Sequence, residues 1–536
     1  MPTERIGPNL KRFLPWFALI CLLDFGLRFS ALTFDSLYLD EAYQSMYEST
    51  GQPLTPLMKL HGQPLLFRFD EPHPLSDVLA HFREVDPLCP PLYGVLLNRW
   101  RVIAGSSDFA LRGFSVVFSV LANIAEMIFA TAIFGPVVGL CTGLLQAISP
   151  FDLTYGQEVR MYSLELFLAI SSTGCLVWLI QSAKTRSRLL ACALYAVSTC
   201  ALINTHYTAV FTVIYQALFA SIVCWKRRDG RLLLWLIAGW ALCGVLFMPW
   251  LNLLLQAQAN SKGSFYVARR FTWWWPVWAL LGRIPLNWCG FLSGSRVPAY
   301  FAPIYVTSGV VLAFGINNAI RAVRSAPKTE SNGSATAAGS LISHYLILSW
   351  AIVPALMLWI LDVIESRKVV EVARYLIATA PAVYMLAGLG MAALLRRKKW
   401  WQFLLLGHVL LALANITYYH IVPQRRPWRQ MAQKVEELVK PDEILMISQY
   451  YDIVCLDRYL HRPVRQLGLS PNMGADYARD TIRSIAGMQR FWLITAEDGD
   501  SIVTMIPAEF HQSSLIRLPH DLHLYSYDRT GSSSSK

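Results

Sequence analysis

Residues 110–132 read ALRGFSVVFSVLANIAEMIFATA and include only two ionisable side chains, Arg112 and Glu126. A helix that crosses a bilayer needs about 20 mostly apolar residues, so this segment is long and apolar enough to span a membrane. The same test along the chain predicts ten further spans, at 13–31, 137–153, 160–181, 189–204, 207–225, 232–254, 300–320, 343–361, 375–394 and 401–419. We therefore predict an α-helical polytopic membrane protein with about 11 transmembrane helices.

The composition agrees with this prediction. Of 536 residues, 54% are hydrophobic and 15% are charged, whereas a soluble domain carries roughly 25% charged residues. The composition therefore argues against a soluble multidomain enzyme. The first span is not expected to be a cleaved signal peptide, because it contains Asp24 and Arg28 and has no small-residue cleavage site before the polar stretch that follows.

The distribution of basic residues predicts the orientation, because cytoplasmic loops concentrate lysine and arginine. Five basic runs fall on the same side of the predicted spans, within 5–12, 184–188, 226–231, 321–328 and 396–399. This places the N-terminus in the cytoplasm, and the loops 32–109, 154–159, 255–299 and 362–374 outside, with everything after 424. The net charge is 47 − 35 = +12, but the residues from 424 onward hold 14 basic and 14 acidic side chains. The basic excess therefore belongs to the membrane part, and no nucleic-acid partner is expected.

The last hundred residues have a different pattern. WRQMAQKVEELVK (428–440) is typical of an amphipathic helix, and EILMIS (443–448), RFWLITA (490–496) and LHLYSYD (522–528) are typical of short strands. We predict a transmembrane catalytic domain over 1–423, with 32–109 as its first extracytoplasmic loop, and a small extracytoplasmic α/β domain over 424–536.

Polar residues gather in the predicted outer loops. Asp40 and Glu41 follow the first span, where adjacent carboxylates are costly to desolvate unless they pair, bind a metal or take part in proton chemistry. Taken alone, such a pair is more often an exposed acidic turn. A second motif, between the third and fourth spans, consists of Tyr155, Gln157, Glu158, Arg160 and Tyr162. We expect Glu158 and Tyr162 to be i, i+4 neighbours on one helix face, with Arg160 either binding phosphate or anchoring a helix end.

Six motifs occur in a fixed order: SLYLDEAYQSMYE (36–48), DPLCPPLYGVLLNRWRVIAGSSDFALRGFSVVFSVL (86–121), SPFDLTYGQEVRMYSLELF (149–167), NTHYTAVF (204–211), EVARYLIATAPAV (371–383) and RPWRQMAQ (426–433). Together they resemble the C-type (GT-C) glycosyltransferases of the dolichyl-phosphate-mannose protein mannosyltransferase group. The nearest subgroup is the bacterial one that includes Rgt-like enzymes and, more distantly, the lipid A aminoarabinose transferase.

The resemblance implies a multi-pass enzyme of the bacterial inner membrane. Such an enzyme moves a sugar from a polyprenyl-phosphate donor to a glycan, lipid or protein acceptor on the extracytoplasmic face, with inversion expected because one displacement flips the anomeric centre. Asp40 is then the candidate general base or metal ligand, and Glu41 its partner and orienter. The candidate substrate-binding residues are Asp86, Tyr155, Gln157, Glu158, Arg160, Tyr162, His206, Arg374 and Tyr375.

Arg374 has two interpretations, a side chain that reaches lipid head groups and a clamp for the carrier phosphate; the family pattern favours the clamp. A divalent metal is expected to be bound, if at all, by Asp40, Glu158 and His206. The family commonly has histidine before the Pro90–Pro91 pair, and Cys89 stands there instead, which puts a histidine-dependent contact in doubt.

Two other functions stay open. A transporter or flippase of a lipid-linked glycan would place polar sites within broken helices and internal repeats. No repeat is visible, and the polar clusters lie at one predicted edge, which favours catalysis. A catalytically inactive receptor or assembly factor is the third alternative.

Overall fold

The computed structural model describes residues 10–52, 64–65, 73–260, 303–325, 335–366, 369–469, 485, 487–496 and 501–530. The chain forms two compact units, and both are discontinuous in sequence. The helical unit consists of 1–30, 86–93 and 112–419, and the mixed unit consists of 31–85, 94–111 and 420–536.

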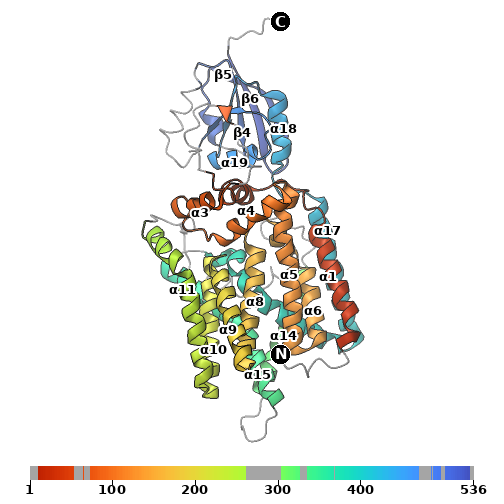
Figure 1. The fold of residues 1–536 in the computed structure, drawn as a ribbon. Coiled ribbons are helices and arrows are strands. Elements are labelled where there is room, and N and C mark those ends of the chain that lie inside the picture. Colours follow the sequence, from red (N-terminus) through yellow and green to blue (C-terminus); the bar gives the residue numbers. More distant parts are fainter. Residues whose placement is uncertain are drawn as a thin grey trace. The chain divides into compact units, whose positions relative to one another are not determined.

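Long apolar helices build the helical unit (Figure 1). They are α1 (Leu14–Phe29), α5 (Asp108–Phe134), α6 (Pro136–Ala147), α7 (Pro150–Gln157), α8 (Tyr162–Gln181), α9 (Thr185–Ile203), α10 (Val210–Arg227), α11 (Gly230–Asn260), α14 (Pro303–Arg324), α15 (Ala335–Glu365), α16 (Ala380–Leu395) and α17 (Lys399–Ile421). Among the described residues, nine helices are long and apolar enough to cross a membrane, and the bent pair α6–α7 makes ten if it is one span. The predicted polytopic helical fold is confirmed.

The helix α16 lies at the centre of the helical unit. The span Arg374–Leu395 is 89% buried, far more than any other candidate span. It packs against α14 through glycines: a Cβ on Gly390 would lie 1.9 Å from the carbonyl oxygen of Val311, and a Cβ on Gly315 would lie 1.7 Å from that of Leu386. The two backbones approach this closely because neither helix has a side chain at these positions.

The predicted span 137–153 is not one helix. It is broken between α6 and α7, whose axes differ by 62°. Ser149 accepts a hydrogen bond from the backbone N–H of Asp152 and so caps α7, and Pro150 occupies its first turn. Proline disfavours helical geometry in the preceding residue, so the Ser-Pro sequence ends one helix and starts another.

The predicted i, i+4 pairing of Glu158 with Tyr162 is also wrong. The helix α7 ends at Gln157, Glu158 has an extended backbone (φ −73°, ψ 141°), and α8 begins only at Tyr162. These two residues therefore lie on either side of a sharp corner and share no helix face.

A buried ion-pair network joins α1 to α7. Arg28 on α1 contacts Asp24 at 2.8 Å and Asp152 of α7 at 2.9 Å, and each of the three side chains is at most 3% exposed. Removing one partner of such a network would leave an uncompensated buried charge, which costs about 3–5 kcal/mol. The charges that interrupt the first apolar segment therefore serve helix–helix packing.

The mixed unit contains a six-stranded sheet in the order β1-β3-β2-β4-β6-β5. The strands are β1 (Pro64–Leu65), β2 (Ile444–Ile447), β3 (Val464–Gly468), β4 (Arg490–Thr495), β5 (Phe510–Leu518) and β6 (Leu522–Arg529). The three central strands β3, β2 and β4 are parallel, and the remaining pairings are antiparallel. Its helices are α2 (Leu39–Tyr43), α3 (Leu75–Glu84), most of α4 (Leu92–Ala104), α18 (Trp428–Leu438) and α19 (Ile453–Asp457).

The first predicted outer loop takes part in this sheet. Strand β1 comes from the loop and pairs with β3 of the C-terminal region. Asp108, at the end of the same region, accepts hydrogen bonds from Arg429, Arg458 and Tyr459 at 2.7–3.2 Å. The loop and the C-terminal region therefore fold together, although more than 300 residues separate them in sequence.

Candidate functional site

Five of the residues predicted to bind substrate lie together in the helical unit. They come from four elements: α7, α8, the turn at 206, and the 3₁₀ helix η9 (Ala373–Thr379) that leads into α16. We call this group the aromatic cluster: Tyr155, Tyr162, His206, Arg374 and Tyr375.

The rings of the aromatic cluster form a continuous chain. Tyr155 lies edge-on to Tyr162 at 5.1 Å, and Tyr162 lies 6.1 Å from His206. His206 stacks on Tyr375 at 5.5 Å with an interplanar angle of 23°. The guanidinium of Arg374 lies 6.0 Å from the ring of Tyr162 and 5.7 Å from that of Tyr375. Cation–π contacts at these distances hold the guanidinium plane and orient its N–H groups.

His206 is buried and uncharged. Burial is the main reason that its pKa falls to about 3, and the positive charges of Arg160 and Arg374 lower the pKa further. Its Nδ1 lies 2.5 Å from the hydroxyl of Thr208 and 3.6 Å from a carboxylate oxygen of Glu165. A neutral imidazole at physiological pH can bind a metal or exchange hydrogen bonds, but cannot pair with phosphate as a cation.

Arg160 and Asp86 bring two opposite charges to this part of the helical unit. Burial raises the pKa of Asp86, and the positive charge of Arg160 acts in the opposite direction. The segment 86–93 is fixed there because Tyr93 hydrogen-bonds Ser115 at 2.6 Å and Tyr207 donates to the carbonyl of Pro87 at 3.4 Å.

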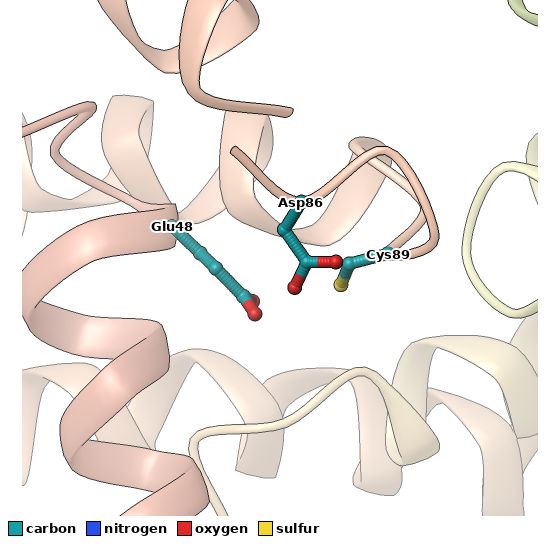
Figure 2. Close-up of side chains that lie close together, drawn as sticks. All are labelled: Glu48, Asp86 and Cys89. Atoms are coloured by element: carbon teal, nitrogen blue, oxygen red, sulfur yellow. The ribbon is translucent and has the colours of Figure 1, made fainter. Parts of the chain in front are cut away.

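Cys89 shares a turn with Asp86. Figure 2 shows the thiol beside the carboxylate, and the backbone N–H of Cys89 donates to the carbonyl of Asp86 at 3.1 Å. The third side chain in that view, Glu48, belongs to the mixed unit. The residue before the Pro90–Pro91 pair therefore presents a thiol, a soft metal-ligating group, beside a carboxylate.

Gln157 and Glu158 lie at the corner after α7. The amide of Gln157 donates to the carbonyls of Arg28 and Ser30 at 2.9 and 3.0 Å, so this side chain also secures the end of α1. Glu158 is buried, and its carbonyl accepts from the N–H of Arg160 at 2.7 Å. The extended backbone of Glu158 and this hydrogen bond mark the break between α7 and α8.

The carboxylate pair lies in the mixed unit at the first turn of α2. Asp40 is partly exposed, whereas Glu41 is fully buried. The carboxylate of Glu41 accepts hydrogen bonds from Arg425 and from the N–H of Tyr38, which closes the start of the helix. The pair therefore has one solvent-accessible member and one that is committed to protein contacts.

Arg425 was not predicted from sequence. It directly precedes the RPWRQMAQ motif, so the motif's position was the available signal. Glu165 was also missed as a neighbour of His206, since its sequence position shows only an acidic residue within a span. The contacts that these two residues make, with Glu41 and with His206, are visible only in the structure.

Neither a protein-family model nor a curated protein sequence matches this chain. Solved structures do match. ArnT from Cupriavidus metallidurans matches in the apo state with a TM-score of 0.59 and 12% identity, over 97% of this chain and 98% of that one. Its complex with undecaprenyl phosphate matches with a TM-score of 0.58 and 13% identity, over 96% and 98%.

The archaeal oligosaccharyltransferase AglB from Archaeoglobus fulgidus, in complex with an inhibitory peptide and a dolichol-phosphate, matches with a TM-score of 0.55 and 11% identity, over 97% of this chain and 74% of that one. These likenesses extend over nearly the whole chain and include the small C-terminal domain. The protein has a GT-C-like fold.

Proposed function

We propose that this chain is a membrane glycosyltransferase that takes a sugar from a polyprenyl-phosphate donor and transfers it to an envelope glycan, lipid or protein on the extracytoplasmic face. The observation that carries the proposal is the aromatic cluster, in which the guanidinium of Arg374 lies against two tyrosine rings. The fold supports it, because the two similar solved proteins bind undecaprenyl phosphate and dolichol-phosphate.

The donor site is assigned to the helical unit. Arg374 and Arg160 bind the carrier phosphate, since arginine offers paired donors to phosphate oxygens. Tyr155, Tyr162 and Tyr375 supply apolar faces and hydroxyls for the sugar and the first isoprene unit. Asp86, Gln157 and Glu158 hold the surrounding loop or bind sugar hydroxyls.

Catalysis is assigned to the acidic pair. A sugar phosphate already carries a good leaving group, so the enzyme has to take a proton from the acceptor and stabilise the phosphate charge that develops. Asp40 acts as the base because it is the accessible member of the pair. One displacement by the acceptor inverts the anomeric centre.

A divalent metal remains part of the proposal, with Asp40, Glu158 and His206 as its ligands. A metal binds the unprotonated imidazole, whereas the positive charges of Arg160 and Arg374 near His206 act against a bound cation. When bound, the metal would neutralise phosphate charge. Loss of activity in a chelator and recovery with one added divalent ion would support the metal; full activity after chelation would remove it from the mechanism.

Transport of a lipid-linked glycan is the second candidate, because one structural feature favours it. The break between α6 and α7 lies beside the buried Arg28–Asp152 pair, and broken helices next to buried charges are typical of transporters.

Reconstituted vesicles separate the two functions. With a labelled polyprenyl-phosphate sugar and a mixture of envelope acceptors, we expect a new glycosidic bond and released carrier phosphate. Movement of the intact donor across the bilayer, with no new bond, would contradict the glycosyltransferase. A strain that lacks this protein should accumulate one lipid-linked sugar, and mass analysis of that lipid would name the donor.

A further inference from the structure

The buried carboxylate of Glu41 is held by a residue from the far end of the chain. Nη1 of Arg425 donates to Oε2 of Glu41, and the same oxygen accepts from the N–H of Tyr38 at 3.3 Å. The guanidinium of Arg425 lies 4.3 Å from the centroid of the Tyr38 ring. Glu41 is 0% exposed and Arg425 is 14% exposed. Tyr38, Glu41 and Arg425 therefore enclose the start of α2, the helix that carries Asp40.

Arg425 belongs to a short segment, 424–429, that hydrogen-bonds residues shortly before Asp40. We call this segment the strap. The N–H of Gln424 donates to the carboxylate of Asp35 at 3.2–3.3 Å, and the N–H of Arg429 donates to the hydroxyl of Ser36 at 3.1 Å. Arg425 is the residue of the strap whose side chain donates to Glu41 of the acidic pair.

The other side of the strap is tied to the C-terminal sheet. The guanidinium of Arg426 donates to the carbonyl of Ala496, directly after β4, and His520 contacts the carbonyl of Pro423 at 2.9 Å. The strap therefore connects the sheet to the turn that carries the proposed base.

The energetics make Arg425 important for the geometry of α2. A buried carboxylate that loses its cationic partner is strongly destabilised, and the local structure has to rearrange to rehydrate it. Asp40 immediately precedes Glu41 in the first turn of α2, so any movement that exposes Glu41 also moves Asp40. A displacement of about 1 Å can lower a catalytic rate by about 100-fold.

We propose that Arg425 is a positioning residue that fixes Asp40 in its reactive orientation by holding Glu41. This inference rests on the proposed function of Asp40. Glu41 then serves as the link between the strap and the base and has no direct contact with substrate. The C-terminal domain contributes to catalysis through this strap.

Initial rates of sugar transfer by the full-length protein test the inference. We expect Arg425→Ala and Glu41→Gln each to lower kcat about 10- to 100-fold, while KM for the lipid donor changes less than about threefold. Arg425→Lys should recover part of the loss, because the amine keeps the charge but not the stacked plane. The double variant should be no slower than the slower single variant, since both changes break one link.

Arg517→Ala is the matched control, because it removes the same charge from an exposed position of β5 in the same unit, outside the strap; its kcat should stay within about twofold of wild type. The inference is overturned if Arg425→Ala keeps wild-type kcat, if Arg517→Ala loses as much, or if the losses in the double variant multiply. If Arg425→Ala does not fold, Glu41→Gln decides, and wild-type kcat there rejects the link. Asp40→Asn in the same assay separates the two claims: full activity in that variant rejects the proposed function itself.

Discussion

Arg374 is the residue on which the proposed phosphate site depends most. Its guanidinium lies against two tyrosine rings, which limit the orientations that the side chain can take. Preorganised donors lose less conformational entropy when they bind a phosphate than a free surface arginine does. The sequence left two interpretations of Arg374 open, a phosphate clamp and a side chain that reaches lipid head groups, and we propose the clamp.

Replacing Arg374 tests this role. We expect Arg374→Ala to raise KM for the polyprenyl-phosphate donor at least about tenfold while KM for the acceptor changes less than about threefold, because the lost contact is to the carrier phosphate. Arg374→Lys should be intermediate. Arg396→Ala, at the exposed opposite end of the same span, is the control and should behave as wild type. Equal losses for donor and acceptor would argue against the clamp.

Asp457 makes the stability of the mixed unit depend on pH. Burial raises its pKa from 3.8 to about 7, although a hydrogen bond from Gln466 lowers the pKa in part. Between about pH 4 and pH 7 the folded protein therefore holds a proton that the unfolded chain has released. The contribution of this group to the free energy of unfolding is fully present below about pH 4 and falls as pH rises, by up to about 1.4 kcal/mol per pH unit.

Thermal unfolding of the purified full-length protein at pH 5 and pH 8 measures this effect. Asp457→Asn should remove most of the difference between the two midpoints, whereas Asp442→Asn, an exposed carboxylate in the same unit, should leave it unchanged. An undiminished difference in Asp457→Asn would show that other groups control the pH response.

At the scale of elements, the close contact between α14 and α16 determines how the central helix is held. A methyl group at Gly390 would overlap the carbonyl of Val311, and backbone atoms cannot move aside as a flexible side chain can. The same helix continues from η9, which carries Arg374 and Tyr375. Tight packing of α16 therefore fixes one side of the aromatic cluster.

Alanine substitutions test this packing. Gly390→Ala should lower the free energy of unfolding by about 1–3 kcal/mol or more, seen as a lower unfolding midpoint in detergent. Gly407→Ala on α17 is the matched control: nothing lies within 4 Å of its added Cβ, and alanine there should be neutral or stabilising by up to about 1 kcal/mol. A midpoint for Gly390→Ala equal to that of the control would contradict the close approach.

At the scale of the whole molecule, the sequence predicted what depends on local pattern. Apolar runs located the helices, and β-rich runs in the tail located β2, β4 and β6 together with α18. The same reasoning missed the break at Ser149–Pro150, because hydropathy averages across a capping residue. It also missed β1, a two-residue strand whose pairing with β3 depends on residues about 400 positions away.

For the candidate site too, the sequence predicted one part and missed another. The sequence motifs predicted five site residues that lie together in one unit of the structure: Tyr155, Tyr162, His206, Arg374 and Tyr375. The partners that define their chemistry, such as Glu165 beside His206 and Arg425 on Glu41, come from long-range packing. The predicted orientation of the termini and the joint action of Asp40 with the aromatic cluster stay predictions.

The most direct test of the central claim is single-turnover sugar transfer by Asp40→Asn, measured with donor binding in the same preparation. We predict that the variant binds the polyprenyl-phosphate sugar within about threefold of wild type but transfers it at least about 100-fold more slowly, because the base is lost while the phosphate site is intact. Transfer at the wild-type rate would contradict the account.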